Sequence, residues 1–300
     1  DTCIITASLE FAGGFLGCST GGAASIMNCS VKVDTVSAFQ KAGGFAGETN
    51  NTEITNCTAE ITDKLQASNP DIYISMILAG FIAKSTGDNV SKSSATVKHF
   101  VFTNNCGPGE AGEVSGFIGR CEDSEISECT VEMDSFGENK ILNDFNIGGL
   151  IGYCYNSYEI KNCSVVCNKV SFGGYGNRLG GLIGYLSSSE VSDCFTDIKF
   201  ENSNDNSFNI GGLIGSLNGY SDVVGCFSNI SIINNNGSPF VIGGLIGYFN
   251  FEGVSVRNCY AKGSIINNKD SGIYIGGLAG YAYGPGGSGF ISNSYSRSTI

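Results

Sequence analysis

The chain has 300 residues, of which 41% are hydrophobic and 44 are glycine, and its formal net charge is −12. The apolar fraction supports a folded core and excludes a disordered chain. The negative charge argues against binding to nucleic acid or to anionic membranes, because both would repel the protein. The longest largely apolar run, residues 72–83, is shorter than the roughly 20 residues that membrane insertion requires.

A glycine motif recurs along the whole chain, most clearly as GGLIG at residues 148–152, 180–184, 211–215 and 243–247. Repeats of 30 to 36 residues indicate a solenoid, a propeller or an array. The abundance of Gly, Asn, Ser and β-branched residues favours strands and turns over helices, and a propeller blade needs more residues than one repeat contains. Aligned on the second glycine, the nine copies of the motif lie at Gly14, Gly44, Gly80, Gly116, Gly149, Gly181, Gly212, Gly244 and Gly277.

Each copy is predicted to contain three strands. The first precedes the motif, as at residues 207–210 and 273–275, and the second is the motif itself. The paired glycines of the motif allow positive φ and a close backbone approach at a corner. The third strand follows about fifteen residues after the motif. The sequence therefore predicts an all-β fold, a right-handed parallel β-helix of about nine coils of roughly 32 residues, stacked about 4.8 Å apart as one continuous domain over residues 1–300.

The third strand begins at a column that holds Cys in most copies and Ser in the others. Apolar and polar residues alternate along this strand in all nine copies, which predicts a half-buried strand with the column facing inward. We favour free, buried thiols that act as small hydrophobic side chains, with disulfides between some neighbouring coils as the alternative. The predicted ladder of buried thiols comprises Cys29, Cys57, Cys129, Cys163, Cys194, Cys226 and Cys259.

Outside this column, Cys121 and Cys154 occupy the same motif position in adjacent copies and are the best candidates for a disulfide bond. Cys3, Cys18 and Cys106 have no evident partner. Seven N-x-S/T sequences are compatible with N-glycosylation of a secreted protein. They lie at Asn28, Asn50, Asn56, Asn89, Asn162, Asn229 and Asn236.

The consensus GGLIGY…VxNCYAKGS resembles the GLUG-motif repeat of bacterial surface and secreted proteins, in which it accompanies adhesins and IgA-cleaving metallopeptidases. The resemblance is tight from Gly148 to Ile265 and looser in the first four copies, where Phe replaces Leu and where Gly80 and Gly116 lack the first glycine. It implies an extracellular, repetitive and non-catalytic region, and the motif of this family carries no catalytic residues.

The sequence offers little for catalysis. His99 is the only histidine, which excludes a metal site built on two histidines. Parallel β-helices do include polysaccharide lyases and hydrolases that use carboxylates. However, Glu60, Glu132 and Asp197 on the polar face stand in alternate coils and form no paired column. We therefore expect no enzyme activity, no cofactor and no metal ion.

One outward column, directly after the Cys column, changes from Ser or Thr to aromatic residues in the last four copies. Such residues can form a contact stripe for a partner or can stack on one another across coils, and both interpretations stay open. The aromatic residues are Phe195, Phe227, Tyr260 and Tyr295. The column four residues after the second motif glycine would widen this surface, with Tyr153, Tyr185, Ser216, Tyr248 and Tyr281.

The expected function is structural. The chain begins in an apolar strand and ends at Ile300 within a coil, so half-coils of two copies could complete one rung and build a head-to-tail surface fibre. A fragment whose caps are not included is the alternative explanation of these ends. The competing function is an adhesin stalk or a glycan-binding region of a larger surface protein, with surface glycans or cell-surface proteins as partners. A polysaccharide lyase or hydrolase ranks last. The expected location is extracellular, at the cell surface.

Overall fold

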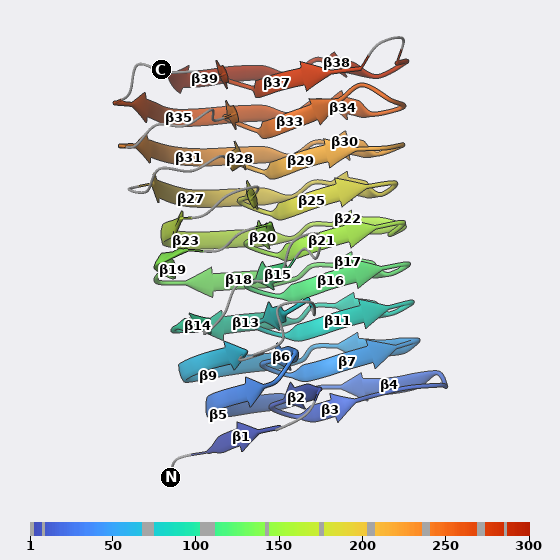
Figure 1. Cartoon of the computed structure of the whole chain (residues 1–300). Helices are drawn as coiled ribbons and strands as arrows, with labels where there is room; N and C mark the ends of the chain where they lie inside the picture. Colours follow the sequence, from blue (N-terminus) through green and yellow to red (C-terminus); the bar gives the residue numbers. More distant parts are fainter. Residues whose placement is uncertain are drawn as a thin grey trace.

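The computed structural model describes residues 3–7, 10–67, 75–102, 112–141, 144–173, 177–202, 208–235, 241–268, 274–284 and 287–300. These residues form a parallel β-solenoid in which strands follow one another around a coil and pair with the equivalent strands of the coils above and below (Figure 1). Every strand pair in the described part of the chain is parallel. The prediction of an all-β parallel β-solenoid is confirmed.

Two sheets hold the strand before the motif and the motif itself, and each has nine strands within the described residues. The pre-motif sheet contains β2 (Phe11–Gly13), β6 (Lys41–Gly43), β10 (Ile77–Ala79), β15 (Gly112–Ser115), β20 (Phe145–Gly148), β24 (Asn177–Gly180), β28 (Phe208–Gly211), β32 (Val241–Gly243) and β36 (Tyr274–Gly276). The motif sheet contains β3 (Leu16–Cys18), β7 (Ala46–Asn50), β11 (Ile82–Thr86), β16 (Ile118–Glu122), β21 (Ile151–Tyr155), β25 (Ile183–Ser187), β29 (Ile214–Asn218), β33 (Ile246–Asn250) and β37 (Ala279–Tyr283).

Two further sheets complete the coil. The post-motif sheet contains β4 (Ala24–Met27), β8 (Thr52–Thr55), β12 (Asn89–Ser91), β17 (Glu125–Ser127), β22 (Glu159–Lys161), β26 (Glu190–Ser192), β30 (Asp222–Val224), β34 (Ser255–Arg257) and β38 (Phe290–Ser292). The long-strand sheet contains β1 (Ile4–Thr6), β5 (Ser30–Ala38), β9 (Thr58–Ala67), β13 (Ser94–Val97), β18 (Thr130–Met133), β23 (Ser164–Gly173), β27 (Phe195–Asn202), β31 (Phe227–Asn234), β35 (Tyr260–Asn267) and β39 (Tyr295–Thr299). It also includes β14 (Phe100–Phe102) and β19 (Phe136–Ile141), which pair with β9 and β23.

Two details of the prediction are wrong. The coil has four strands rather than three. The strands of the post-motif sheet were missed because, with three or four residues each, they are too short to show an alternating pattern. The described part of the chain has about seven turns of about 33 residues, not about nine coils. The first and last copies of the motif form end rungs that are covered on one side only. Phe15 in the first rung is 49% exposed, whereas Phe45 in the next rung is fully buried.

The motif glycines are required for close approach and not for positive φ, which corrects a second expectation. In the described residues no paired motif glycine has positive φ. A Cβ on Gly148 would lie 1.8 Å from the carbonyl oxygen of Ile151, and one on Gly149 would lie 2.2 Å from that of Gly181. The bend between the pre-motif and motif sheets therefore leaves no room for a side chain at the second glycine, which all nine copies keep, whereas Ala79 and Ser115 occupy the first position in two copies.

One continuous core of buried side chains runs from Ala12 to Ile265. The residue that follows the second motif glycine points into it in each coil. Phe15, Phe45, Phe81 and Phe117 stack there with ring centroids 4.6 to 4.8 Å apart. Buried leucines continue the same file at Leu150, Leu182, Leu213 and Leu245. The replacement of Leu by Phe in the early copies therefore gives an internal aromatic ladder. Among the described residues, none belongs to a helix long and apolar enough to cross a membrane.

Candidate functional site

The corner that leads into the long-strand sheet is formed by a residue in the left-handed backbone region. All nine copies of the repeat place such a residue directly before the Cys column, with φ between 48° and 66°. Asn and Gly tolerate this region best, and Asp is also enriched there, which explains most of the column. The nine residues are Asn28, Asn56, Lys92, Glu128, Asn162, Asp193, Gly225, Asn258 and Asn293.

The thiols of the Cys column form hydrogen bonds between coils. The thiol of Cys194 donates to the carbonyl oxygen of Ser192 at 3.2 Å and accepts the backbone N–H of Cys163 at 3.4 Å. Ser93 occupies the same column and makes the same two bonds, donating at 2.8 Å and accepting the N–H of Cys57 at 3.0 Å. The column thus accepts the backbone N–H of the preceding coil in five corners, a role that the expectation of a hydrophobic thiol missed.

The predicted thiol ladder is buried as expected in most of its length. Six of its cysteines are at most 1% exposed, and Cys29 in the first rung is half-buried. Burial, followed by contact with the neighbouring Cys163 thiol, raises the pKa of Cys129 well above its ordinary value. A thiol held neutral in this way is a poor nucleophile and a poor metal ligand. The buried members are Cys57, Cys129, Cys163, Cys194, Cys226 and Cys259.

Serine hydroxyls form an equivalent ladder at the corner that precedes the post-motif sheet. The Ser189 hydroxyl accepts the backbone N–H of Ser157 at 3.0 Å, and the Ser124 hydroxyl accepts that of Asp88 at 3.1 Å. Asp88 replaces serine in this file and is 3% exposed. Burial raises the pKa of its carboxyl group, although the Ser85 and Thr49 hydroxyls donate to it at 2.6 Å and favour the charged form.

Cys121 and Cys154 lie opposite each other in adjacent coils, as the sequence predicts. They are register partners on β16 and β21, and both are fully buried. Both are free thiols in the structure, with the Cys154 thiol donating to the Ser189 hydroxyl at 3.7 Å. The disulfide between them stays a prediction. Cys3 and Cys18 are exposed, and Cys106 lies outside the described residues.

The aromatic column forms a stacked ladder on the outer face of the long-strand sheet. Its ring centroids are 4.2 Å apart between Phe195 and Phe227, 4.7 Å between Phe227 and Tyr260, and 5.3 Å between Tyr260 and Tyr295. The inner rings therefore cover one another's faces and present their edges to solvent, which is the stacking interpretation. We call these four residues the aromatic stripe.

The second aromatic column lies on the outer face of the motif sheet and is interrupted. Tyr153 stacks on Tyr185 at 5.2 Å, and Tyr248 stacks on Tyr281 at 5.8 Å. Ser216 stands between these two pairs and is buried. Because the column belongs to a different sheet, it does not widen the aromatic stripe as expected.

The candidate glycosylation sites differ in exposure. Asn28, Asn56, Asn89 and Asn162 are exposed, and Asn28, Asn56 and Asn162 share the corner described above. Asn50 and Asn229 are half-buried on strands. Asn236 lies outside the described residues. These four exposed residues are therefore the most accessible of the predicted acceptors in the described part of the chain.

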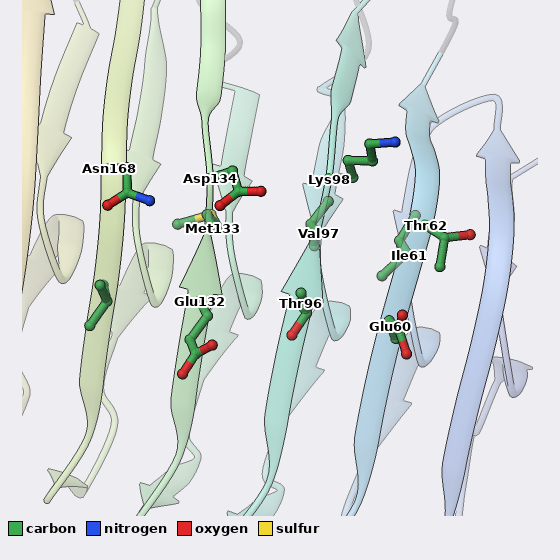
Figure 2. Close-up of a pocket in the computed structure, with 11 residues that line it drawn as sticks. Glu60, Ile61, Thr62, Thr96, Val97, Lys98, Glu132, Met133, Asp134 and Asn168 are labelled. Atoms are coloured by element: carbon green, nitrogen blue, oxygen red, sulfur yellow. The ribbon is translucent and has the colours of Figure 1, made fainter.

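A groove of about 370 Å³ lies on the outer face of the long-strand sheet, across β9, β13, β18 and β23. Figure 2 shows two rows of outward side chains that cross the strands. The first row contains Glu60, Thr96 and Glu132, and the second contains Thr62, Lys98, Asp134 and Asn168. We call this hollow the acidic groove, because its three carboxylates outnumber its single ammonium group.

The acidic groove lies where the long-strand sheet departs from its regular register. The strand is interrupted between β13 and β14 and between β18 and β19, and the register shifts between Cys167 and Val170. Such irregularities bend a strand and re-aim its side chains. Only the Glu60 carboxylate of this groove has a cationic partner among the described residues, since Lys32 Nζ lies 2.6 Å from its Oε1. No sign of this hollow was visible in the sequence, because its outward residues, apart from the apolar Val166, fit the alternating pattern.

A buried carboxylate lies on the neighbouring outer surface, where the pre-motif and motif sheets meet. Glu113 on β15 is fully buried and is bound by the Arg120 guanidinium, whose Nε lies 3.2 Å from the carboxylate Oε1. The Ser75 hydroxyl donates to the other oxygen at 3.2 Å. Burial raises the pKa of Glu113 to about 7, although Arg120 opposes the shift. The sequence did not indicate this pair.

The chemistry of these sites is limited. Glu60 and Glu132 are separated by the strand of Thr96, so the two carboxylates stand two turns apart and not side by side. No group of three or more His, Cys, Asp or Glu side chains that could hold a metal ion is found in the described ranges. The chain matched no protein-family model, no curated protein and no solved structure. The resemblance to GLUG-motif proteins therefore stays a prediction.

Proposed function

We propose that the chain is a structural, non-catalytic rod that forms part of an extracellular fibre or stalk. The observation that carries the proposal is the register of equivalent residues, which continues from coil to coil through the first half of each long strand. In the file that begins at Thr96, for example, the pairing runs through Glu132, Val166, Asp197 and Asn229 to Lys262. A site built for catalysis would be expected to break such a repeat around its reacting groups.

The internal ladders support a stiff rod. Stacked phenylalanines, corner thiols and corner serines each link one coil to the next, so bending the solenoid would separate several contacts at once. We further propose that the coil is right-handed, as nearly all crossover connections between parallel strands are. An interface between copies of the chain is part of this proposal, because a fibre needs one.

The glycan-binding alternative has less support. Sugar rings stack on exposed aromatic faces, whereas the inner rings of the aromatic stripe cover each other. The exposed ring edges and the acidic groove offer polar contacts but no open aromatic platform.

Electron microscopy on the native source tests the proposed function. Antibodies against the chain, detected with gold particles on unfixed cells, should label filaments or stalks that project from the surface. Labelling confined to the cell interior, or to cell surfaces without any extended structure, would contradict the proposal.

A further inference from the structure

The outer face of the long-strand sheet is divided into two halves of opposite character. The acidic groove occupies β9 to β23, and the aromatic stripe occupies β27 to β39. The face is not covered by any other described element of the chain. An interface related by two-fold symmetry requires such self-complementarity, because each copy must present both partners of every contact.

Unpaired charges of opposite sign lie on the two halves. Glu132 and Asp134 are exposed in the acidic groove, and neither takes part in an ion pair among the described residues. Lys262 and Arg297 are exposed beside the aromatic stripe. Their charged groups lie over the rings of Phe227 and Tyr295, at 5.7 and 5.8 Å from the ring centroids, and not against a carboxylate.

The register places these charges at matching positions. Glu60, Thr96 and Glu132 belong to the same outward file as Lys262 and Arg297. Consider two copies that meet face to face with their solenoid axes antiparallel. The two-fold axis that relates them lies in the interface, parallel to the strands, between β23 and β27. Lys262 of one copy then faces Thr96 of the other, between the Glu60 and Glu132 carboxylates, and Arg297 faces Glu60.

The remaining contacts of this arrangement are compatible. The aromatic stripe of one copy would lie over the short hydroxyl side chains of Ser94, Thr130 and Ser164 of the other, since these precede it in the same file. Short side chains leave room for the rings. The long Lys262 and Arg297 side chains would extend into the acidic groove, which is hollow at that point.

We propose that two copies of the chain associate through the outer faces of their long-strand sheets, with Lys262 and Arg297 of each copy bound in the acidic groove of the other. The inference rests on the proposed structural function and names the partner as a second copy. Exposed ion pairs are individually weak and are screened by salt, so the dimer is expected to be reversible and sensitive to ionic strength.

Sedimentation equilibrium of the full 300-residue chain tests the proposal. The wild-type chain should form dimers at low ionic strength, and its dissociation constant should rise about tenfold or more in about 0.5 M NaCl. The dissociation constant should rise by a similar factor in the double variant Lys262→Glu/Arg297→Glu and in the double variant Glu132→Lys/Asp134→Lys. Lys161→Glu, on the post-motif sheet, is the matched control and should dimerise like the wild type.

The mixture of the two double variants is the decisive sample. The first variant keeps the acidic groove and gains carboxylates beside the aromatic stripe, and the second keeps Lys262 and Arg297 and gains lysines in the groove, so the mixture should dimerise again although neither variant does alone. Circular dichroism on each variant shows whether it is folded. A monomeric wild type at low salt would overturn the proposal, as would unlimited growth into filaments or a mixture that fails to recover.

The outcome is separable from that of the proposed function. If surface filaments are labelled by the antibodies but the isolated chain stays monomeric, only the lateral contact is refuted. If the groove instead binds soluble chitosan oligosaccharides in a manner that depends on Glu132 and Asp134, the second copy is the wrong occupant and the proposal fails.

Discussion

At the scale of single residues, the corner thiols act as hydrogen-bonding groups as well as core side chains. Cys194 and Ser93 each donate to a carbonyl oxygen two residues earlier and accept an N–H from the neighbouring coil. The sequence contained a sign of this role, because Ser replaces Cys at positions 93 and 294 in an otherwise constant column. The prediction of inward thiols was possible from alternation alone, whereas the hydrogen bonds depend on the corner geometry.

Replacement of Cys194 separates the two roles. Cys194→Ser should change the free energy of unfolding by less than about 1 kcal/mol, because the hydroxyl can make both hydrogen bonds. Cys194→Ala should cost about 1–3 kcal/mol, because it leaves the buried N–H of Cys163 unsatisfied. Urea unfolding of both variants measures the difference. An alanine variant as stable as the serine variant would show that the hydrogen bonds contribute nothing.

Glu113 makes the stability of the fold depend on pH. Its pKa is raised from 4.5 to about 7 by burial, so the folded chain binds this proton more tightly than the unfolded chain does. The stabilisation is complete below about pH 4.5 and is lost as the pH rises through about 7. The loss amounts to about 3 kcal/mol from the size of the shift.

The variant Glu113→Gln has no proton to lose and should remove this dependence. Between pH 4 and pH 8, the free energy of unfolding measured in urea should fall in both proteins. The fall should be about 3 kcal/mol smaller for Glu113→Gln than for the wild type. Glu125→Gln, at an exposed position on β17, is the control and should follow the wild type. Superimposable pH profiles of the wild type and Glu113→Gln would contradict the assignment.

At the scale of the elements, the corners define the coil more than the strands do. The Asn that precedes the Cys column in five of the nine copies was visible in the sequence. Its meaning was missed because residues that disfavour positive φ, Lys92 and Glu128, also occupy the position. The structure gives all nine positions positive φ, including these two. The post-motif strands were also missed, since each contributes only one inward residue, as Val191 does in β26. Six strands of the long-strand sheet have eight or more residues and are readily predicted.

Glycine at a corner occupied by a charged residue should stabilise the chain. Glu128 has φ of 54°, a region that costs a side-chain-bearing residue roughly 1 kcal/mol and costs glycine nothing. Glu128→Gly should therefore raise the free energy of unfolding by up to about 1 kcal/mol. Thr130→Gly, two residues later on β18, should lower it, because a strand position gains nothing from the freedom of glycine. Destabilisation by both substitutions would show that the corner is not strained.

At the scale of the whole molecule, the coils behave as interchangeable units. Removal of residues 182–212, one repeat of the sequence, joins Gly181 to Leu213 in register, because Gly180 and Gly211 are paired. In repeat proteins each unit contacts only its neighbours. The shortened chain should therefore fold, keep its β-sheet circular dichroism and unfold cooperatively with slightly lower stability. The account would be contradicted if this deletion abolished all structure while a deletion that does not remove a whole number of repeats left the chain folded.

The repeat in the sequence was enough to predict the solenoid, because nine similar segments can bury their apolar faces only against one another. The number of fully covered turns was less predictable, since it depends on which rungs have neighbours on both sides. The acidic groove and the Glu113–Arg120 pair depend on contacts between residues that no spacing rule connects.

The distance between spin labels in one outward file tests the solenoid most directly. Ser25, Glu53 and Glu190 lie on the post-motif sheet in one file, in which Glu53 and Asn89 are partners. Labels introduced as genetically encoded amino acids avoid the native thiols. Double electron–electron resonance should give about 24 Å between positions 25 and 190, and about 19 Å between positions 53 and 190, at 4.8 Å per turn. Distances that do not differ by one turn spacing would contradict the stacking of one coil per motif.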